Sequence, residues 1–310
     1  MISDLAGARV AVTGASGFCG AAVARRAAAA GADVLCLGRR PGPVGRHVFW
    51  DAAGGPPDLS DADLVVHLAA AVGDPPNSAA AETAYRAVNV DGTHRLLDAA
   101  GDRPVVWVSS ASVYHPRLRG GRIREDDPIG GQLTAYGRTK AEGERLALAA
   151  GAVVLRPRAV YGNGDRYLLP RIQRSVRGGV AVLPGPDVRL SLTHVENLAD
   201  ACLIASQWPA GAYNIADARS YWRDAAVRAV LAATGRPVRL VHVPLWLARS
   251  AAAMLGTVSR LVPGVRPVLT RYAVDQVGRD VVLDIGKATA QGWYPRLSLM
   301  DYLNGAGPRL

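Results

Sequence analysis

Tyr136 and Lys140 are the residues whose types and spacing first suggest chemistry. They open a segment that favours helix up to position 150, and residues four apart share one face of a helix. A tyrosine with an ordinary pKa near 10 exchanges protons poorly at neutral pH. A cation within several ångströms lowers that pKa by roughly 1–3 units. The pair can therefore exchange a proton with an oxygen atom of a bound molecule.

The alternative is a surface tyrosine and lysine on an amphipathic helix. Against it stands the rarity of lysine, since Lys140 and Lys287 are the only two lysines among 36 basic residues. A surface cation in this chain is nearly always an arginine. Lysine is compact and carries three rotatable donors, so its use at this spacing favours a chemical role.

Two serines follow a predicted strand at residues 105–108. This run is short, apolar and β-branched, and Ser109 and Ser110 come directly after it. Side chains at the carboxyl end of a parallel strand lie at the edge where α/β sheets bind ligands. The sequence therefore predicts hydroxyl groups in a ligand crevice.

A glycine-rich turn is the element around which these groups must be arranged. Residues 8–12 predict a buried parallel strand, and residues 21–30 predict a helix that ends at Gly31. Glycines between them let the backbone approach a pyrophosphate at the positive end of the helix. Their spacing differs from G-x-G-x-x-G, but the strand–turn–helix context favours a dinucleotide site. The predicted contacts in this turn are Gly14, Ser16, Gly17, Phe18 and Gly20.

The end of the second predicted strand, residues 33–37, bears on the choice of cofactor. In dinucleotide-binding folds this strand end meets the adenosine ribose, where a carboxylate would repel a 2′-phosphate. Here Gly38 is followed by Arg39 and Arg40, and guanidinium groups pair well with phosphate. We therefore expect NADP(H) rather than NAD(H), the alternative being a solvated surface turn.

Residues 63–70 predict another buried strand, in which we expect His67 to be packed rather than to act as a base. The small residues at the end of this strand would let a flat ring lie against the backbone. Residues 78–100 predict a long helix, and Gly92 inside it costs roughly 1 kcal/mol relative to alanine, which indicates close packing. The ring-contacting residues at the strand end are Leu68, Ala69 and Ala70.

Composition narrows the class of protein. A chain of 310 residues exceeds the usual domain size, so we expect two lobes. A net charge of +10 suits nucleic acid or anionic membrane, but the arginines are scattered and their densest cluster, at 117–124, runs into three acidic residues. We expect no nucleic-acid partner. Three widely spaced cysteines form no disulfide or zinc pattern, which predicts a cytoplasmic location and no metal.

Targeting and membrane signals are weak. Few residues precede the first predicted strand, so we expect no signal peptide. The apolar stretch at 240–262 carries Arg249 and Arg260 and is too short and too charged to predict a membrane span. Two interpretations stay open for its large side chains, which either line an apolar pocket or belong to ordinary core. They are Leu245, Trp246, Leu247, Met254 and Leu255.

Together these motifs resemble those of the extended short-chain dehydrogenase/reductases, the NAD(P)-dependent epimerase/dehydratase family. The resemblance covers almost the whole chain, and the part at 156–201 is similar to the 3β-hydroxysteroid dehydrogenase branch. It rests on residues 13–20, 67–70, 89–93, 109–110, 136 and 140, 155–162, 194–201 and 213–217.

The resemblance implies an α/β fold, a Rossmann-type doubly wound parallel sheet with a smaller C-terminal substrate lobe. Residues 1–162, with 190–217 returning to them, would bind the dinucleotide. Residues 163–189 and 218–310 would form the substrate-binding lobe. A homodimer is the assembly we expect.

The family's roles imply Ser110, Tyr136 and Lys140 as a catalytic trio, with Tyr136 and Lys140 also contacting the cofactor. Sugar 4,6-dehydratases of the family carry an Asp–Glu pair just after the catalytic hydroxyl, and Ala111 and Ser112 in its place argue against dehydration. We expect His194 to be structural. The remaining implied cofactor contacts are Asp51 near the adenine and Pro157, Ala159 and Val160 near the nicotinamide.

The sequence thus predicts an NADPH-dependent ketoreductase, or secondary-alcohol dehydrogenase, for a bulky, largely apolar ketone such as a steroid-like or polycyclic compound. A nucleotide-sugar epimerase or 4-ketoreductase is the alternative, and it would need a diphosphate site, for which Arg166, Arg171 and Arg189 are candidates. A dinucleotide-sensing protein is a third possibility. It needs no proton donor, so the intact trio argues against it.

Overall fold

The computed structural model describes residues 5–73, 78–116, 121–233, 235, 238–261 and 270–306, with backbone alone for 258–261 and 306. The predicted basic cluster at 117–124 therefore lies partly outside the described residues, as does residue 262 at the end of the apolar stretch.

A seven-stranded sheet forms the centre of the molecule, in the order β12-β6-β5-β4-β1-β2-β3. Every pairing in it is parallel. The chain winds outward from β1 in both directions, so β1 and β4 flank the point where the order reverses, which is where such sheets bind ligands. The strands are β1 (Arg9–Thr13), β2 (Asp33–Gly38), β3 (Arg46–Phe49), β4 (Leu64–His67), β5 (Val105–Val108), β6 (Val153–Pro157) and β12 (Gly211–Ile215).

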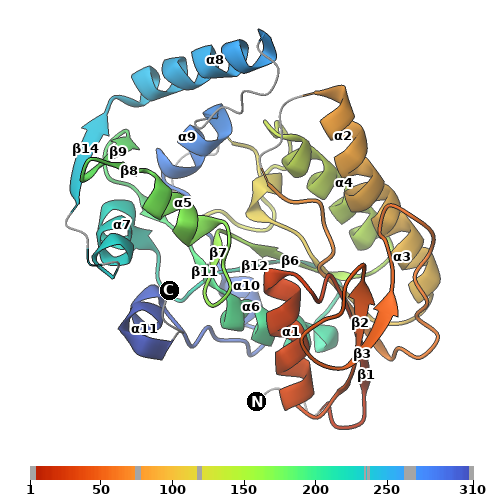
Figure 1. The fold of residues 1–310 in the computed structure, drawn as a ribbon. Coiled ribbons are helices and arrows are strands. Elements are labelled where there is room, and N and C mark those ends of the chain that lie inside the picture. Colours follow the sequence, from red (N-terminus) through yellow and green to blue (C-terminus); the bar gives the residue numbers. More distant parts are fainter. Residues whose placement is uncertain are drawn as a thin grey trace.

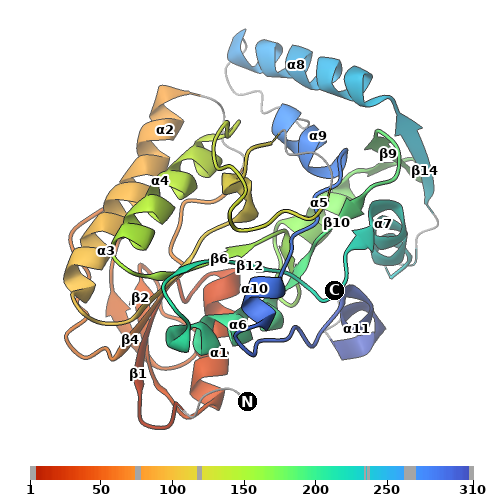
Figure 2. The same cartoon turned by 180° about the vertical axis from the view of Figure 1, so that it is seen from behind.

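Helices cover both faces of this sheet (Figures 1 and 2). Successive side chains of a strand point to opposite faces. Accordingly Val10 and Val12 join the apolar cluster under α1 and α6, whereas Ala11 joins the cluster under α3 and α4. These helices are α1 (Phe18–Ala29) and α6 (Val195–Ile204) on one face, and α2 (Ala79–Arg86), α3 (Gly92–Ala100) and α4 (Ala135–Ala149) on the other.

The long helix predicted at 78–100 is continuous but changes pitch. A π-helical turn, Ala87–Asp91, joins α2 to α3. A Cβ atom on Gly92 would lie 2.5 Å from the carbonyl oxygen of Ala52. The close packing predicted for this glycine is confirmed.

A second group of elements lies beyond the carboxyl edge of the sheet. Its largest piece is a three-stranded sheet in the order β14-β9-β8, next to which Figure 1 shows α5, α7, α8 and α9. The strands are β8 (Val176–Arg177), β9 (Val180–Pro184) and β14 (Arg239–Val243), and the helices α5 (Leu168–Arg174), α7 (Arg223–Ala232), α8 (Leu245–Leu261) and α9 (Arg271–Val277).

Short pieces connect the two groups. β7 (Val160–Tyr161) pairs with β11 (Thr193–His194), and β10 (Arg189–Leu190) pairs with β13 (Tyr221–Trp222). The remaining helical turns are the 3₁₀ turns Ala111–Val113 and Ala205–Gln207, α10 (Gly286–Thr289), α11 (Leu299–Asp301) and the π-helical turn Tyr302–Ala306.

The apolar stretch that was predicted to be pocket lining or core is largely exposed on α8. Trp246 is 68% exposed and Met254 70%, while the small Ala248 and Ala252 face the protein. The core interpretation is therefore wrong for Trp246, Leu247, Met254 and Leu255, which are exposed, whereas Leu245 packs beside the two alanines against Val274. Among the described residues, no helix is long and apolar enough to cross a membrane.

Candidate active site

The turn between β1 and α1 has room for a backbone but not for side chains. Gly14 has a φ of +67°, and a Cβ there would lie 3.0 Å from backbone atoms of Ala69. A Cβ on Gly20 would lie 2.3 Å from the carbonyl oxygen of Gly14. α1 then begins after Gly17, whose lack of a side chain leaves the first N–H groups of the helix without a capping side chain from that position. This cradle fits the pyrophosphate of a dinucleotide, which helix N-termini bind through such groups.

Thr13 joins the ends of β1 and β4 beside this cradle. Its buried Oγ1 accepts hydrogen bonds from the backbone N–H groups of Leu68 and Ala69, both at 3.0 Å. With both lone pairs used, its proton points to Nδ1 of His67, 2.8 Å away. Burial, with the charge of Lys140, lowers the pKa of His67 to about 3. His67 is neutral and packed, as predicted.

The predicted adenosine end lies at the carboxyl end of β2. Arg39 and Arg40 are exposed in the bend that follows Gly38. The backbone N–H of Trp50 donates to the carbonyl of Gly38 at 3.2 Å, which brings Asp51 to the same edge. The fold thus gathers Arg39, Arg40 and Asp51 at the strand end where a ribose would lie.

Helix α4 brings Tyr136 to Ser110. Thr134 caps the helix by accepting a hydrogen bond from the N–H of Gly137 at 3.1 Å, so Tyr136 lies in the first turn. Its hydroxyl lies close enough to the side chain of Ser110 for Ser110 to lower its pKa. Ser110 in turn accepts from the N–H of Ser112 at 3.2 Å, which orients its oxygen.

The direction of the Tyr136 pKa differs from the sequence expectation. Burial raises it well above its ordinary value, and the nearby Ser110 only partly opposes this effect. We expected a lowered pKa from the Lys140 charge. The desolvation of a phenolate outweighs such effects here, and Tyr136 is a neutral proton donor at pH 7.

Lys140 points from the same helix face to the end of β5. Its Nζ donates to the carbonyl of Val108 at 2.7 Å and lies 3.6 Å from the ring centroid of Trp107. The side chain is 2% exposed, and burial lowers its pKa to about 7 although the nearby Glu144 raises it. Lys140 therefore titrates near neutrality.

A buried polar network lies behind the trio, and the sequence analysis did not predict it. Glu144, one turn after Lys140, accepts hydrogen bonds from Ser109 and from Arg156, whose Nη2 lies 2.6 Å away. Arg156 also donates to the Tyr114 hydroxyl at 2.8 Å. The spacing 136, 140, 144 on one helix was the available signal, but it did not identify Arg156 as the partner.

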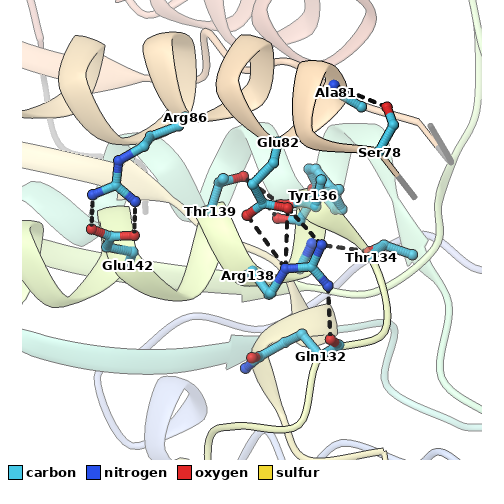
Figure 3. Close-up of polar contacts among 12 residues, drawn as sticks. Ser78, Ala81, Glu82, Arg86, Gln132, Thr134, Tyr136, Arg138, Thr139 and Glu142 are labelled. Atoms are coloured by element: carbon cyan, nitrogen blue, oxygen red, sulfur yellow. Dashed lines mark hydrogen bonds and ion pairs between the residues drawn. The ribbon is translucent and has the colours of Figure 1, made fainter. Parts of the chain in front are cut away.

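Helices α2 and α4 are tied together beside the site, as Figure 3 shows. Arg138 pairs with Glu82 at 2.5 Å, and Arg86 pairs with Glu142. Asn89, in the π-helical turn, donates to the Thr139 hydroxyl at 3.0 Å. It also donates to the carbonyl of Ala71 and accepts from the N–H of Ala71. These contacts fix the helix that carries Tyr136 and Lys140.

The predicted nicotinamide end lies at the carboxyl end of β6. Pro157 ends this strand next to β5, and Val160 starts the short pairing with β11. Ala159 between them has a φ of +46°, the one positive φ among the described non-glycine residues. Strained backbone of this kind clusters at functional sites.

His194 is structural, as predicted. Its Nδ1 accepts a hydrogen bond from the N–H of Glu196 at 3.2 Å at the start of α6. Burial lowers its pKa to about 4, so it is uncharged at pH 7.

A polar groove of about 590 Å³ lies elsewhere, between the end of α4 and α10, and is lined by Arg124, Glu125, Asp126, Leu148, Arg156, Ala212, Asp284, Gly286 and Lys287. None of the predicted site residues lines it.

Comparisons with known proteins agree with this geometry. A family model described as "NAD dependent epimerase/dehydratase family" matches residues 10–216. A 2-alkyl-3-oxoalkanoate reductase of Stenotrophomonas maltophilia is 29% identical, covering 87% of this chain and 89% of the relative. A 3 beta-hydroxysteroid dehydrogenase/Delta 5-->4-isomerase of Mycobacterium tuberculosis is 31% identical, covering 74% of this chain and 70% of the relative. The solved structure of MoeE5 in complex with UDP-glucose and NAD has a TM-score of 0.73 at 27% identity, covering 96% of each chain.

Proposed function

This chain belongs to the NAD-dependent epimerase/dehydratase family, and from that premise we propose that it is an NADPH-dependent ketoreductase, or the reverse secondary-alcohol dehydrogenase, for a bulky and largely apolar ketone. It is an oxidoreductase acting on CH–OH or C=O groups. The observation that carries the proposal is that Tyr136 in the first turn of α4 lies close enough to Ser110 at the carboxyl edge of the sheet for Ser110 to lower its pKa, with Lys140 on the same helix.

The roles of the trio follow from this geometry. A bound nicotinamide supplies or accepts the hydride. Ser110 and Tyr136, whose side chains lie close together, bind the carbonyl oxygen, where negative charge develops. Tyr136, protonated because of its raised pKa, donates its proton to the forming alkoxide. Lys140 provides a positive charge that stabilises the resulting phenolate and binds the ribose.

The same proposal assigns the cofactor contacts. Gly14, Ser16, Gly17, Phe18 and Gly20 form the pyrophosphate cradle, and Leu68, Ala69 and Ala70 flank the rings. Arg39 and Arg40 bind the 2′-phosphate of NADP(H). The exposure of both guanidinium groups at the end of β2 supports this preference, although the matching MoeE5 structure holds NAD.

Cofactor choice can be tested without a substrate. The wild-type protein should bind NADPH more tightly than NADH, and an Arg39→Ala, Arg40→Ala variant should lose most of the difference. Each lost charge-assisted contact weakens binding by about ten- to a hundredfold, or roughly 1.5–3 kcal/mol. Arg46→Ala, an exposed arginine on β3 paired with Asp61, is the matched control. Equal binding of both cofactors by the wild type would contradict the assignment.

We also propose the functional division of the chain. Residues 1–162 with 190–217 bind the dinucleotide, which is supported by the seven strands of the central sheet lying within these ranges. Residues 163–189 and 218–310 form the substrate lobe. A cytoplasmic homodimer remains our expectation.

A nucleotide-sugar epimerase or 4-ketoreductase is the second candidate, favoured by the similarity to MoeE5. Its three candidate diphosphate ligands are exposed on separate elements, and Arg189 already donates to Ser220 at 3.0 Å and stacks on Trp222. This arrangement gives the second candidate less support than the first receives from the relatives named as a 2-alkyl-3-oxoalkanoate reductase and a 3 beta-hydroxysteroid dehydrogenase. The three arginines are Arg166, Arg171 and Arg189.

Thermal shift of the NADP-loaded protein separates the two candidates. A ligand at a hundred times its dissociation constant stabilises the protein by about 2.7 kcal/mol. We expect stabilisation by 2-alkyl-3-oxo acids or polycyclic ketones. A shift with UDP or TDP, and none with any ketone, would favour the epimerase.

A further inference from the structure

Helix α8 presents an apolar face to the outside of the molecule. Figures 1 and 2 both show it at the outer edge, away from the central sheet and next to α9. It packs on the protein through Ala248 and Ala252, which cluster with Val274 of α9. A surface helix usually turns charged residues outward. Between residues 246 and 257, however, every exposed side chain of α8 is uncharged.

The exposed large side chains of α8 form one stripe. Met254 follows Leu247 by seven residues and Trp246 by eight, which places all three on one side of a helix. Trp246 is 68% exposed and Met254 70%. Contiguous apolar surface of this kind marks interaction sites, whereas single exposed apolar residues need no explanation.

The apolar surface continues from α8 onto β9 and β14. Val182 and Val241 are partners in the register of these strands, and both are exposed. Val243 shares the face of β14 that carries Val241, since alternate residues of a strand point the same way. Val243 also packs against the alanines through which α8 is held. The helix and this face of the small sheet therefore form one surface.

The chain around this surface has basic residues and no acidic ones. Residues 225–274 contain seven arginines and neither aspartate nor glutamate, so they carry +7 of the net charge of +10. Arg239 is exposed on the same face of β14 as the two valines, and Arg271 is exposed in the first turn of α9. Arg249 has a different role, since it pairs with Asp275 at 2.9 Å and joins α8 to α9.

An apolar stripe bordered by arginines fits the surface of an anionic lipid bilayer. Interfacial helices bury such a stripe at the boundary between headgroups and acyl chains, and nearby arginines attract anionic headgroups. A second copy of the chain fits less well, because it would bring two strongly basic segments together. We propose that α8 and the adjoining face of β9 and β14 form a docking surface for an anionic lipid bilayer. This inference is independent of the proposed reductase function.

Vesicle sedimentation tests the proposal. The wild type should bind vesicles of phosphatidylcholine with about 30% phosphatidylglycerol at least about tenfold more tightly than vesicles of phosphatidylcholine alone, because each arginine near the surface strengthens binding about fivefold. High salt should remove most of this preference by screening. A wild type that does not bind the anionic vesicles would overturn the proposal and leave the reductase standing.

Replacement of the stripe tests its part in binding. Trp246→Glu with Met254→Glu should weaken binding to the anionic vesicles by about a hundredfold through lost apolar burial, with little change in the midpoint of thermal unfolding. Tyr294→Glu with Met300→Glu is the matched control, because these side chains are 68% and 50% exposed at α11 and the change in charge is the same. Equal losses in both pairs would show that net charge alone binds the vesicles, and the docking surface would be wrong.

Replacement of the arginines tests the charged border. Arg239→Ala with Arg271→Ala should weaken binding to the anionic vesicles about fivefold for each arginine and leave binding to phosphatidylcholine unchanged. Arg25→Ala with Arg145→Ala, at exposed positions of α1 and α4, is the control and should bind as the wild type does. An equal effect of the two pairs would contradict a border confined to this surface.

Tryptophan fluorescence identifies the face that meets the lipid. The emission of the wild type should shift to shorter wavelength on the anionic vesicles. Trp246→Phe should remove this shift, and Trp222→Phe, at a side chain that is 51% exposed on β13, should keep it. A shift that persists in Trp246→Phe would overturn the proposal. A wild-type dimer that ignores vesicles and dissociates in Trp246→Glu with Met254→Glu would assign this face to a second copy instead.

Discussion

At the scale of single residues, the hydroxyl of Tyr136 has the role that is most readily tested. It lies close to Ser110 and is neutral at pH 7 because burial raises its pKa. Tyr136→Phe should lower kcat by about 10²–10⁴-fold, the usual contribution of proton transfer, with little change in NADPH affinity. Tyr167→Phe, at a side chain that is 58% exposed, is the control. Near-normal turnover in Tyr136→Phe would show that another group donates the proton.

Lys140 makes stability depend on pH in a definite direction. Its pKa is lowered from 10.5 to about 7 on folding, chiefly by burial. Between these values the unfolded chain holds a proton that the folded chain has lost, so this residue makes stability rise as pH increases from about 7 to 10. Below pH 7 both states are charged and the full cost of burial applies.

Urea unfolding of Lys140→Met and wild type at pH 7 and pH 9.5 measures this effect. The free energy of unfolding of the variant minus that of the wild type should be more favourable to the variant at pH 7 than at pH 9.5. The variant also loses the hydrogen bond to Val108. This loss lowers its free energy of unfolding equally at both pH values, so the comparison between them isolates the effect of the pKa. A difference between the proteins that does not change with pH would contradict the lowered pKa.

At the scale of elements, α4 is the helix whose position decides the geometry of the site. It is joined to α2 by two ion pairs (Figure 3), and its Thr139 accepts a hydrogen bond from Asn89 of the π-helical turn. A Cβ on Gly143 would lie 2.3 Å from the carbonyl oxygen of Asn89 and 3.0 Å from the ring of Trp107. This glycine sets how closely α4 approaches its neighbours.

Two helical glycines therefore predict opposite effects of alanine. Gly143→Ala should destabilise the protein by about 1–3 kcal/mol through overpacking and lower turnover, because α4 carries Tyr136 and Lys140. Gly256→Ala on α8, where a Cβ meets no described atom within 4 Å, should stabilise by up to about 1 kcal/mol. Chemical denaturation of both variants checks this. Equal effects would contradict the packing described for α4.

Elements with a local signal could be predicted from sequence. The β-branched run at 105–108 predicted a strand, and the i, i+4 spacing of Tyr136 and Lys140 predicted a shared face of α4. Gly92, a glycine inside a helix, predicted close packing. The link between Glu144 and Arg156 could not be predicted, because it joins elements whose register is set by the whole sheet. The direction of the Tyr136 pKa was missed for the same reason, since burial depends on tertiary packing.

At the scale of the whole molecule, the parallel sheet brings together segments that lie far apart in the chain. The glycine turn, Ser110 and Tyr136 all lie at its carboxyl edge. By contrast, the apolar α8 at the periphery exposes Trp246 and Met254. The inferred preference for an apolar ketone therefore draws support from the relatives and not from this helix.

Transfer of isotope from the cofactor tests the central claim most directly. The protein is incubated with a 2-alkyl-3-oxo acid or a polycyclic ketone and with NADPH deuterated at C4 of the nicotinamide, on one face and then on the other. We predict that one of the two cofactors delivers a single deuterium to the new alcohol carbon, as measured by mass spectrometry, and that Tyr136→Phe slows this transfer by about 10²–10⁴-fold. The account would be contradicted if neither labelled cofactor is oxidised and if the protein instead epimerises a UDP-sugar without incorporating deuterium.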